Sequence, residues 1–301
     1  MKQVEGARIW MDGALVPGHE ARIHVLTHAL HYGTAVLEDT NAYLTPDGPA
    51  IFRLDAHLER LYRSARMIGL RIPYDFDELH EATVMTVVAN GHSSCHIRHL
   101  VYRGHGGMGL LARDCPVSVT IATWEWPEPT ADGVRLMTSP WRRNDPAAVP
   151  VLARASGAQL TAALARAEAA EAGFDEAVLL DAGGNVTGCT GADLFLVADG
   201  ALVTPPHTAG GHADVVRDTV ERLASDLGIP VRRREIVRAE LYTADELFLC
   251  DATAGIVWVA SVDNREVVGG EGPVTKTVKH AFDDVVHGRD ARYSDWLTLI
   301  M

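Results

Sequence analysis

Lysine, the residue that supplies a nucleophilic amine in proteins, is almost absent from this chain. The 301 residues hold Lys2, Lys276 and Lys279, and arginine supplies the other 24 of the 27 basic side chains. An arginine guanidinium stays protonated above about pH 12, so it does not act as an imine-forming nucleophile. A bias toward arginine explains the surface composition, but it leaves residues 3–275 without an amine for covalent chemistry.

A metal site and a reactive thiol are the next possibilities that the residue types allow. His207, His212 and Asp214 are potential metal ligands, but their spacing matches no strong metal motif, and histidines are common in loops. The four cysteines are scattered and lack CxxC spacing, which is typical of reduced thiols in a chain of this length. We therefore expect no metal, and we interpret Cys189 as a small buried thiol.

The composition indicates a globular protein without a membrane segment. Hydrophobic residues make up 47% of the chain and charged residues 22%, and no apolar run is long enough to span a bilayer. The N-terminus does not resemble a secretory signal. The net charge of −13 argues against nucleic-acid binding, which depends on basic surface. These properties predict a cytoplasmic protein that binds neither nucleic acid nor membrane.

Apolar periodicity and turn residues predict strands and helices along the whole chain. The pair Asp12 and Gly13 lies between two short apolar runs and predicts a β-hairpin over 8–16. The apolar positions of 54–68 recur at helical spacing, and Asp55 suits the positive end of that helix. The other predicted elements are helices over 159–172 and 215–227, and strands over 96–102, 117–124, 177–180, 194–197 and 247–249.

A break in the pattern divides the chain into two parts. Residues 126–133, Trp-Pro-Glu-Pro-Thr-Ala-Asp-Gly, have the proline, glycine and aspartate content of a linker. We therefore predict a smaller N-terminal α/β domain over 1–127, an interdomain linker over 128–135 and a larger C-terminal α/β domain over 136–301. The predicted class is α/β, or α+β, without an internal repeat.

A series of motifs gives the chain a resemblance to a known family. Residues 22–34, Arg-Ile-His-Val-Leu-Thr-His-Ala-Leu-His-Tyr-Gly-Thr, resemble the first signature of the branched-chain aminotransferases, which have the class IV, D-amino-acid-aminotransferase-like fold. The resemblance continues in Ile51–Leu54, His57, Arg60, Leu61, His96–Arg98, Gly173–Ala177, Leu180, Asp181, Leu241–Phe248, Gly272–Lys276, Trp296 and Leu297. It covers nearly the whole chain in order. It implies a two-domain fold, a site between the domains, and a homodimer.

The resemblance also implies an enzyme that uses pyridoxal phosphate. In the family a lysine forms a Schiff base with the cofactor and moves the substrate's α-proton. That lysine lies in an Ala-Lys-x-x-Gly-Asn-Tyr segment, where this chain has Ala153–Gln159, Ala-Arg-Ala-Ser-Gly-Ala-Gln. Arg154 is therefore expected at the lysine position, and we predict that no ordinary Schiff base forms there.

Other positions that the resemblance assigns to the cofactor differ as well. Gly188 replaces a glutamate that pairs with the pyridine nitrogen. The two phosphate loops, Gly-Ile-Thr-Arg and Gly-Thr-Ala in the family, become Asp214–Arg217 and Asp251–Thr253, while Arg53 is retained at the phosphate. Two unit charges about 4 Å apart interact by about 4 kcal/mol at an effective dielectric constant near 20, so both aspartates oppose a phosphate dianion. We therefore expect no cofactor, pyridoxal phosphate included.

New ionisable groups at these positions favour acid–base chemistry on a small-molecule substrate. The family's Phe-Glu-Gly-Ile-Arg becomes Leu37–Asn41, and the candidate catalytic residues are Asp214, Asp251 and Arg154. Arg154 either binds a substrate carboxylate or neutralises aspartates, and the two aspartates are either an acid–base pair or salt-bridge partners. The candidate substrate-binding residues are Tyr32, Asp39, Asn41, Arg53, Arg98, Trp126, Gln159, Asp193 and Thr253.

Three hypotheses for the function follow from these replacements. The first is an enzyme independent of pyridoxal phosphate, a lyase, isomerase or cyclase for a small amino-acid-derived or carboxylate substrate of specialised-metabolite biosynthesis. The second is a non-catalytic scaffold or partner protein that keeps the aminotransferase-like fold. The third is an atypical branched-chain aminotransferase that binds the cofactor non-covalently. Simultaneous changes at the lysine, the ring partner and the phosphate loops favour the first.

Overall fold

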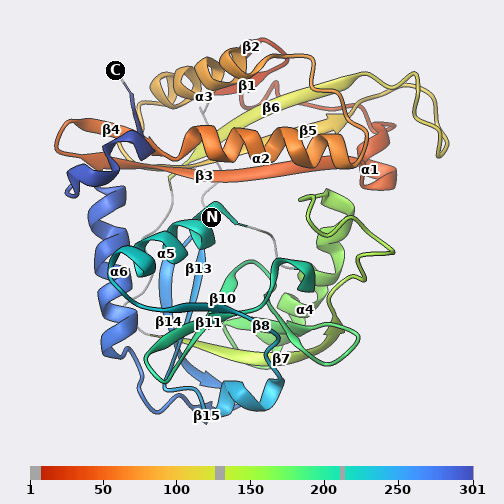
Figure 1. Cartoon of the computed structure of the whole chain (residues 1–301). Coiled ribbons are helices and arrows are strands. Elements are labelled where there is room, and N and C mark those ends of the chain that lie inside the picture. Colours follow the sequence, from red (N-terminus) through yellow and green to blue (C-terminus); the bar gives the residue numbers. More distant parts are fainter. Residues whose placement is uncertain (1–7, 126–132, 211–213, 301) are drawn as a thin grey trace. The chain divides into compact units, whose positions relative to one another are not determined.

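The chain forms two compact units in the computed structural model, which describes residues 8–125, 133–210 and 214–300 (Figure 1). Unit 1 comprises Met1–Pro127, Ala153–Gly157 and Val285–Met301, and unit 2 comprises Glu128–Leu152 and Ala158–Asp284. The domain boundaries expected from the sequence stay a prediction, and most of the expected linker lies outside the described residues. What matters for the site is that the short segment Ala153–Gly157 belongs to unit 1.

Unit 1 is built on a seven-stranded sheet with the order β16-β4-β3-β5-β6-β1-β2, and its neighbouring strands are antiparallel. The expected hairpin is confirmed, since Asp12 and Gly13 have φ angles of 48° and 96°, as a two-residue turn requires. The strands are β1 (Arg8–Met11), β2 (Ala14–Pro17), β3 (Ala35–Thr45), β4 (Gly48–Phe52), β5 (Cys95–Arg103), β6 (Val117–Trp124) and β16 (Leu297–Leu299).

Helices α2 (Leu54–Met67) and α3 (Phe76–Asn90) share one apolar core with this sheet. The expected helix over 54–68 is confirmed, and its periodic apolar residues, among them Leu58 and Leu61, are buried. Asp75 begins α3 with a capping box, in which the Glu78 amide donates to its side chain over 2.9 Å. The short α1 (His28–Tyr32) and the 3-10 helix η4 (Ala291–Trp296) complete the described elements of unit 1.

Unit 2 is built on a nine-stranded mixed sheet with the order β12-β11-β10-β13-β14-β7-β8-β9, to which β15 is added beside β14. Its strands are β7 (Val134–Arg142), β8 (Glu176–Leu180), β9 (Val186–Cys189), β10 (Asp193–Ala198), β11 (Ala201–Thr204), β12 (Val231–Arg233), β13 (Glu246–Asp251), β14 (Gly255–Val262) and β15 (Arg265–Glu266). The pairs β11–β12, β14–β7 and β7–β8 are parallel.

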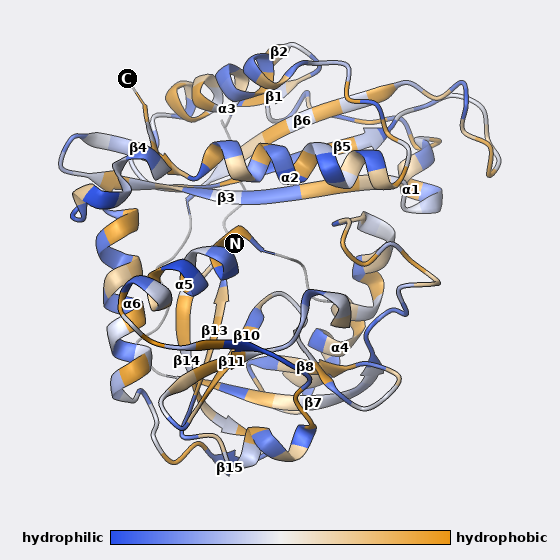
Figure 2. Ribbon diagram, viewed as in Figure 1, coloured by the Kyte–Doolittle hydropathy of each residue, from blue (hydrophilic) through white to orange (hydrophobic). Residues whose placement is uncertain are grey.

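The helices of unit 2 are α4 (Gln159–Glu171), α5 (Val215–Asp226) and α6 (Pro273–Val286), with the 3-10 helices η1 (Ser156–Ala158), which begins in unit 1, η2 (His207–Ala209) and η3 (Arg238–Tyr242). The helices and strands expected in this half are confirmed to within two residues at each end. Strands β10 and β13 are almost entirely buried, and their central residues are apolar. Figure 2 shows β13 in orange. Within the described ranges, no helix has the length and apolarity to cross a membrane.

Two glycines that end helices of unit 1 allow a matched test of the packing around segment Ala153–Gly157. Gly33 and Gly91 have φ angles of 63° and 65° at the ends of α1 and α3. A Cβ on Gly33 would lie 2.5 Å from the Cα of Gly157, whereas a Cβ on Gly91 meets nothing within 4 Å.

We expect Gly91→Ala to lower the free energy of unfolding by about 1–2 kcal/mol through its left-handed backbone alone. Gly33→Ala should cost about 1–3 kcal/mol more, because the methyl group overlaps the backbone of Gly157. Urea denaturation of the two variants measures both losses. Equal losses would contradict the close approach of Gly33 and Gly157.

Candidate active site

Strand β3 carries a polar run, Glu38 to Asn41, and the alternation of a strand sends its members to opposite faces of the sheet. Glu38 faces α2, where it contacts His57 and Arg60. Asp39 and Asn41 lie on the other face and pair across the ladder with Arg98 and His96 of β5. Figure 2 shows this stretch of β3 in blue beside an orange start. The sheet therefore separates two buried ionic groups. One lies between the sheet and α2, and the other lies on the opposite face of the sheet, which we call its outer face.

The core group around Glu38 is structural. Its carboxylate accepts hydrogen bonds from His57 Nδ1 over 2.7 Å and from Arg60 Nε over 2.8 Å, and all three side chains are buried. Burial alone would raise the pKa of Glu38, but the charge of Arg60 and the His57 hydrogen bond hold that pKa below its ordinary value. The Glu38 carboxylate thus ties α2 to β3. His57 has a structural role as a partner of this carboxylate.

Asp39 gathers three donors on the outer face of the sheet. Its Oδ1 accepts from Arg98 Nε over 2.6 Å and lies 3.1 Å from His96 Nε2, while its Oδ2 accepts from Arg154 Nη2 over 2.8 Å. Burial favours the neutral acid, but the His96 hydrogen bond and the charges of Arg154 and Arg98 hold the pKa of Asp39 well below its ordinary value. Asp39 is therefore a permanent anion and not a proton acceptor at neutral pH. Asn41 joins the group through His96 Nδ1, 2.8 Å from its Oδ1.

The segment that carries Arg154 is attached to β3 by its backbone. The Leu37 amide donates to the carbonyl oxygen of Arg154 over 3.0 Å, and Ala155 forms an antiparallel bridge with Val36. Gly157 donates to the carbonyl of Gly33 over 3.2 Å. These contacts explain why Arg154, 115 residues from Asp39 in sequence, meets it in space. Of the two interpretations of Arg154, the structure shows the contact with an aspartate.

Arg98 is held at one end and exposed at the other. Its Nε is bound to Asp39, its guanidinium carbon lies 5.5 Å from the ring centre of Trp124, and 46% of its side chain is exposed. Within the part of the chain that the structure describes, its two terminal nitrogens have no hydrogen-bond partner. A guanidinium fixed in this way presents a fork to a carboxylate.

Tyr32 and Arg53 are separate from this group but belong to the same unit. Tyr32 is 41% exposed and its ring lies 4.5 Å from that of His28. Arg53 precedes α2 with a left-handed φ of 48°, its amide donates to the Trp296 carbonyl over 2.6 Å, and its guanidinium lies 4.8 Å from the Trp296 ring centre. Asp214 and Asp251 belong to unit 2, so the position of Arg53 does not test whether these aspartates are salt-bridge partners.

In unit 2, Asp251 has the environment of a proton-transfer group. It ends β13 and its Oδ1 accepts from the amides of Thr253 and Ala254 over 2.5 and 2.6 Å. Desolvation raises the pKa of Asp251 to about 7, and the charges of Asp214 and Glu176 act in the same direction against the two amides. A carboxyl group with this pKa can donate or accept a proton near neutral pH.

A buried arginine, Arg217, lies near Asp193 and Glu221 in the helix that Asp214 caps. Asp214 is the N-cap of α5 and accepts from the Val216 amide over 2.8 Å. Arg217 is fully buried, with its Nη1 3.5 Å from Asp193 Oδ1 and its Nε 3.3 Å from Glu221 Oε1. The amides of Val216, Thr253 and Ala254, in the two segments that resemble phosphate loops, thus already have a carboxylate acceptor.

The sequence missed two further residues of these groups, His96 and Arg143. His96 and Arg98 are two residues apart in β5 and therefore lie on the same face of the sheet, a spacing that could have placed both beside Asp39. Arg143 is half-buried and donates to the Cys189 carbonyl over 2.7 Å. A Cβ on Gly188 would lie 3.9 Å from its Nη2. Burial raises the pKa of Cys189 well above its ordinary value, as befits the small buried thiol that we expected.

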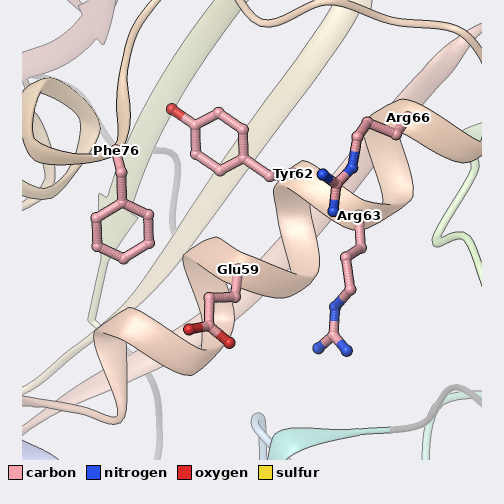
Figure 3. Close-up of a pocket in the computed structure, with 5 residues that line it drawn as sticks. All are labelled: Glu59, Tyr62, Arg63, Arg66 and Phe76. Carbon is pink, nitrogen blue, oxygen red and sulfur yellow. The ribbon is translucent and has the colours of Figure 1, made fainter.

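The other expected site residues and the surface hollows lie apart from the groups around Asp39 and Asp251. Gln159 is the first residue of α4 and is partly buried, and Trp126 and His212 lie outside the described residues. Figure 3 shows a hollow along α2 lined by Glu59, Tyr62, Arg63, Arg66 and Phe76, and a second hollow beside it is lined in part by Arg53, Asp295 and Trp296. Apart from Arg53, no expected site residue lines either hollow. No set of His, Cys, Asp and Glu within the described ranges is arranged to hold a metal ion.

Comparison with known proteins identifies full-length relatives. The family model for amino-transferase class IV matches residues 37–262. The chain is 39% identical to the branched-chain-amino-acid aminotransferase of Pseudomonas aeruginosa over 97% of both chains, and 37% identical to that of Escherichia coli K12 over 96% of both. The crystal structure of the branched-chain amino acid aminotransferase from Thermobaculum terrenum in its PLP-form, the holo-form with pyridoxal phosphate, matches with a TM-score of 0.92 and 32% identity, covering 99% of this chain and 100% of that one.

These relatives confirm the expected class IV aminotransferase-like fold but contradict the expected function. They are branched-chain aminotransferases, and one of them is solved in its PLP-form. We predicted a lyase, isomerase or cyclase that had lost its catalytic lysine and needed no pyridoxal phosphate, and that prediction is wrong. The expectation of no cofactor is wrong as well. The prediction failed because it treated the covalent link as essential, whereas a covalent link is one of several contacts that hold such a cofactor. The third hypothesis, an atypical branched-chain aminotransferase, fits the relatives better.

The raised pKa of Asp251 predicts how one substitution changes stability with pH. Between about pH 4 and pH 7 the folded chain holds a proton on Asp251 that the unfolded chain has released, so this group's contribution to stability falls as pH rises. We expect the stability of Asp251→Asn relative to wild type to increase from pH 5 to pH 8, by up to about 1.4 kcal/mol per pH unit.

Urea denaturation at a series of pH values measures this difference. Asp175→Asn is the matched control in unit 2, because its partner Arg135 and the Arg135 amide lower the pKa of Asp175 despite partial burial. That control should shift stability by a constant amount from pH 5 to pH 8. A constant difference for Asp251→Asn as well would show that Asp251 is ionised throughout.

Proposed function

The chain belongs to the class IV aminotransferase family, and on that premise we propose that it is an atypical branched-chain aminotransferase that uses pyridoxal phosphate without a covalent bond at position 154. The observation that carries the proposal is its identity of 37–39% to branched-chain aminotransferases over nearly the full length of both chains. Its substrates would be branched-chain amino acids and the corresponding 2-oxo acids. When bound, the cofactor supplies the electron sink for amino-group transfer.

The residues present do not fit a covalently attached cofactor. No lysine occurs between Lys2 and Lys276, and the expected lysine position holds Arg154, whose guanidinium is engaged by Asp39. In the loop after β13, the amides of Thr253 and Ala254 already donate to the carboxylate of Asp251. A phosphate group must displace that carboxylate to reach the amides. The proposal is therefore limited to reversible binding.

The chain's own residues supply the other parts of the proposal. Arg98 binds the substrate carboxylate through its two terminal nitrogens, which Asp39 and Trp124 leave exposed. Asp251, with a pKa of about 7, is the group suited to hold or move a proton. Tyr32, Asn41, Gln159, Asp193, Asp214 and Thr253 remain candidate contacts of substrate or cofactor. A homodimer in the cytoplasm is part of the same proposal, and analytical ultracentrifugation tests the dimer.

Because the chain has three lysines, all of them can be removed together to test whether any lysine holds the cofactor. The substitutions Lys2→Arg, Lys276→Arg and Lys279→Arg remove every lysine from the chain. We expect the lysine-free variant to transfer the amino group of 15N-leucine to 2-oxoglutarate at the wild-type rate, provided that pyridoxal phosphate is added. Because no covalent bond retains the cofactor, extensive dialysis should abolish transfer in both proteins, and added cofactor should restore it.

Mass spectrometry of the glutamate product measures the transfer. Arg98→Ala serves as the binding control and should raise KM for leucine at least tenfold, because the loss of a charge-assisted contact costs about 1.5–3 kcal/mol. Absence of 15N-glutamate at every cofactor concentration in wild type would refute the proposed aminotransferase. Loss of activity in the lysine-free variant alone would instead reveal a lysine with a role in catalysis.

A further inference from the structure

The side chain of residue 154 is aimed along β3 by its backbone contacts. The carbonyl of Arg154 accepts from Leu37 and the next residue bridges Val36, so the segment runs beside the start of β3. From there the guanidinium reaches Asp39, two residues beyond Leu37, and donates over 2.8 Å. Only 15% of the Arg154 side chain and 5% of the Asp39 side chain are exposed. The pair is thus shielded from solvent and only weakly screened by salt.

The charged and titratable groups that face Asp39 come from β5 and from the Arg154 segment. They are Arg98, His96 and Arg154, and their nitrogens lie 2.6, 3.1 and 2.8 Å from its carboxylate. The two guanidinium groups and the carboxylate sum to a net charge of +1, counted without His96. Removing Arg154 would leave Asp39 with Arg98 and His96, so the carboxylate would remain ionised and would still attract a cation at position 154.

A lysine at position 154 would therefore meet the same anion. An amine close to a carboxylate is favoured in its charged form, so the pKa of this lysine is higher with Asp39 beside it than without Asp39. The charged ammonium has no lone pair and does not attack a carbonyl group. Reactive lysines have the opposite surroundings, either apolar or cationic.

We infer that Asp39 is a positioning residue that holds the side chain at position 154 as a shielded cation, so that a lysine placed there alone has no reactive amine. The inference rests on the proposed function, because an amine at this position matters when a carbonyl cofactor binds beside it. It follows that a reactive amine at position 154 requires two substitutions in this chain. Arg154→Lys must be combined with a neutral residue at position 39.

The reactivity of the new amine tests the inference without any cofactor. The variants are Arg154→Lys, Arg154→Lys/Asp39→Asn, and Arg154→Lys/Asp290→Asn as a control that removes another carboxylate of unit 1, the partner of Arg292. Each is treated with trace acetic anhydride at pH 8, and acetylation of residue 154 is measured by peptide mass spectrometry. Acetylation should be at least tenfold faster in the Asp39→Asn variant than in the other two, since one pKa unit changes the free-amine fraction tenfold.

Equal rates in Arg154→Lys and Arg154→Lys/Asp39→Asn overturn the inference. Near-UV circular dichroism verifies that each variant is folded, and Asp39→Gly replaces Asp39→Asn if the latter is not. Pyridoxal phosphate and borohydride are then added to the same proteins, and a stable adduct at residue 154 is expected only in the variants without Asp39. If acetylation separates the variants but no adduct forms at residue 154, the role of Asp39 stands and the proposed cofactor binding fails.

Discussion

One shielded carboxylate, Asp39, determines how the outer face of unit 1 is organised. A buried anion is tolerated when donors surround it, and removing one partner of such a group typically costs about 3–5 kcal/mol. Asp39 meets this requirement with His96 and Arg98 from β5 and Arg154 from a segment far away in the sequence. The register of β3 on β5 brings the first two together, and backbone pairing of residues 154 and 155 with β3 supplies the third.

The same physical requirement is met differently in unit 2. There the carboxylates of Asp214 and Asp251 accept from backbone amides, while the buried Arg217 lies near Asp193 and Glu221. Desolvation and neighbouring anions raise the pKa of Asp251 to about 7, whereas cationic partners hold the pKa of Asp39 down. One aspartate is thus a fixed anion and the other a titratable group, and this difference assigns them positioning and proton-transfer roles in the proposal.

Local signals in the sequence were enough to predict much of the fold. The Asp12–Gly13 turn and the apolar spacing of α2 are local features, and both were predicted. Strand β3 is not predicted because the polar run from Glu38 to Asn41 interrupts the apolar alternation, although all four of these residues are buried. The contact of Arg154 with Asp39 depends on pairing over 115 positions, which no local pattern contains. The scarcity of lysine is visible in the sequence, but it does not determine whether the chain binds the cofactor, and a relative at 32% identity is solved in its PLP-form.

We propose that this aminotransferase holds its cofactor by reversible contacts alone. The most direct measurement is an equilibrium titration of the purified wild-type chain with pyridoxal phosphate, followed by absorbance, and then borohydride reduction and intact mass. The account predicts saturable binding that dialysis reverses, with the mass of the chain unchanged after reduction. Absence of saturable binding, or a reduced adduct that maps to a residue of the site, would contradict it.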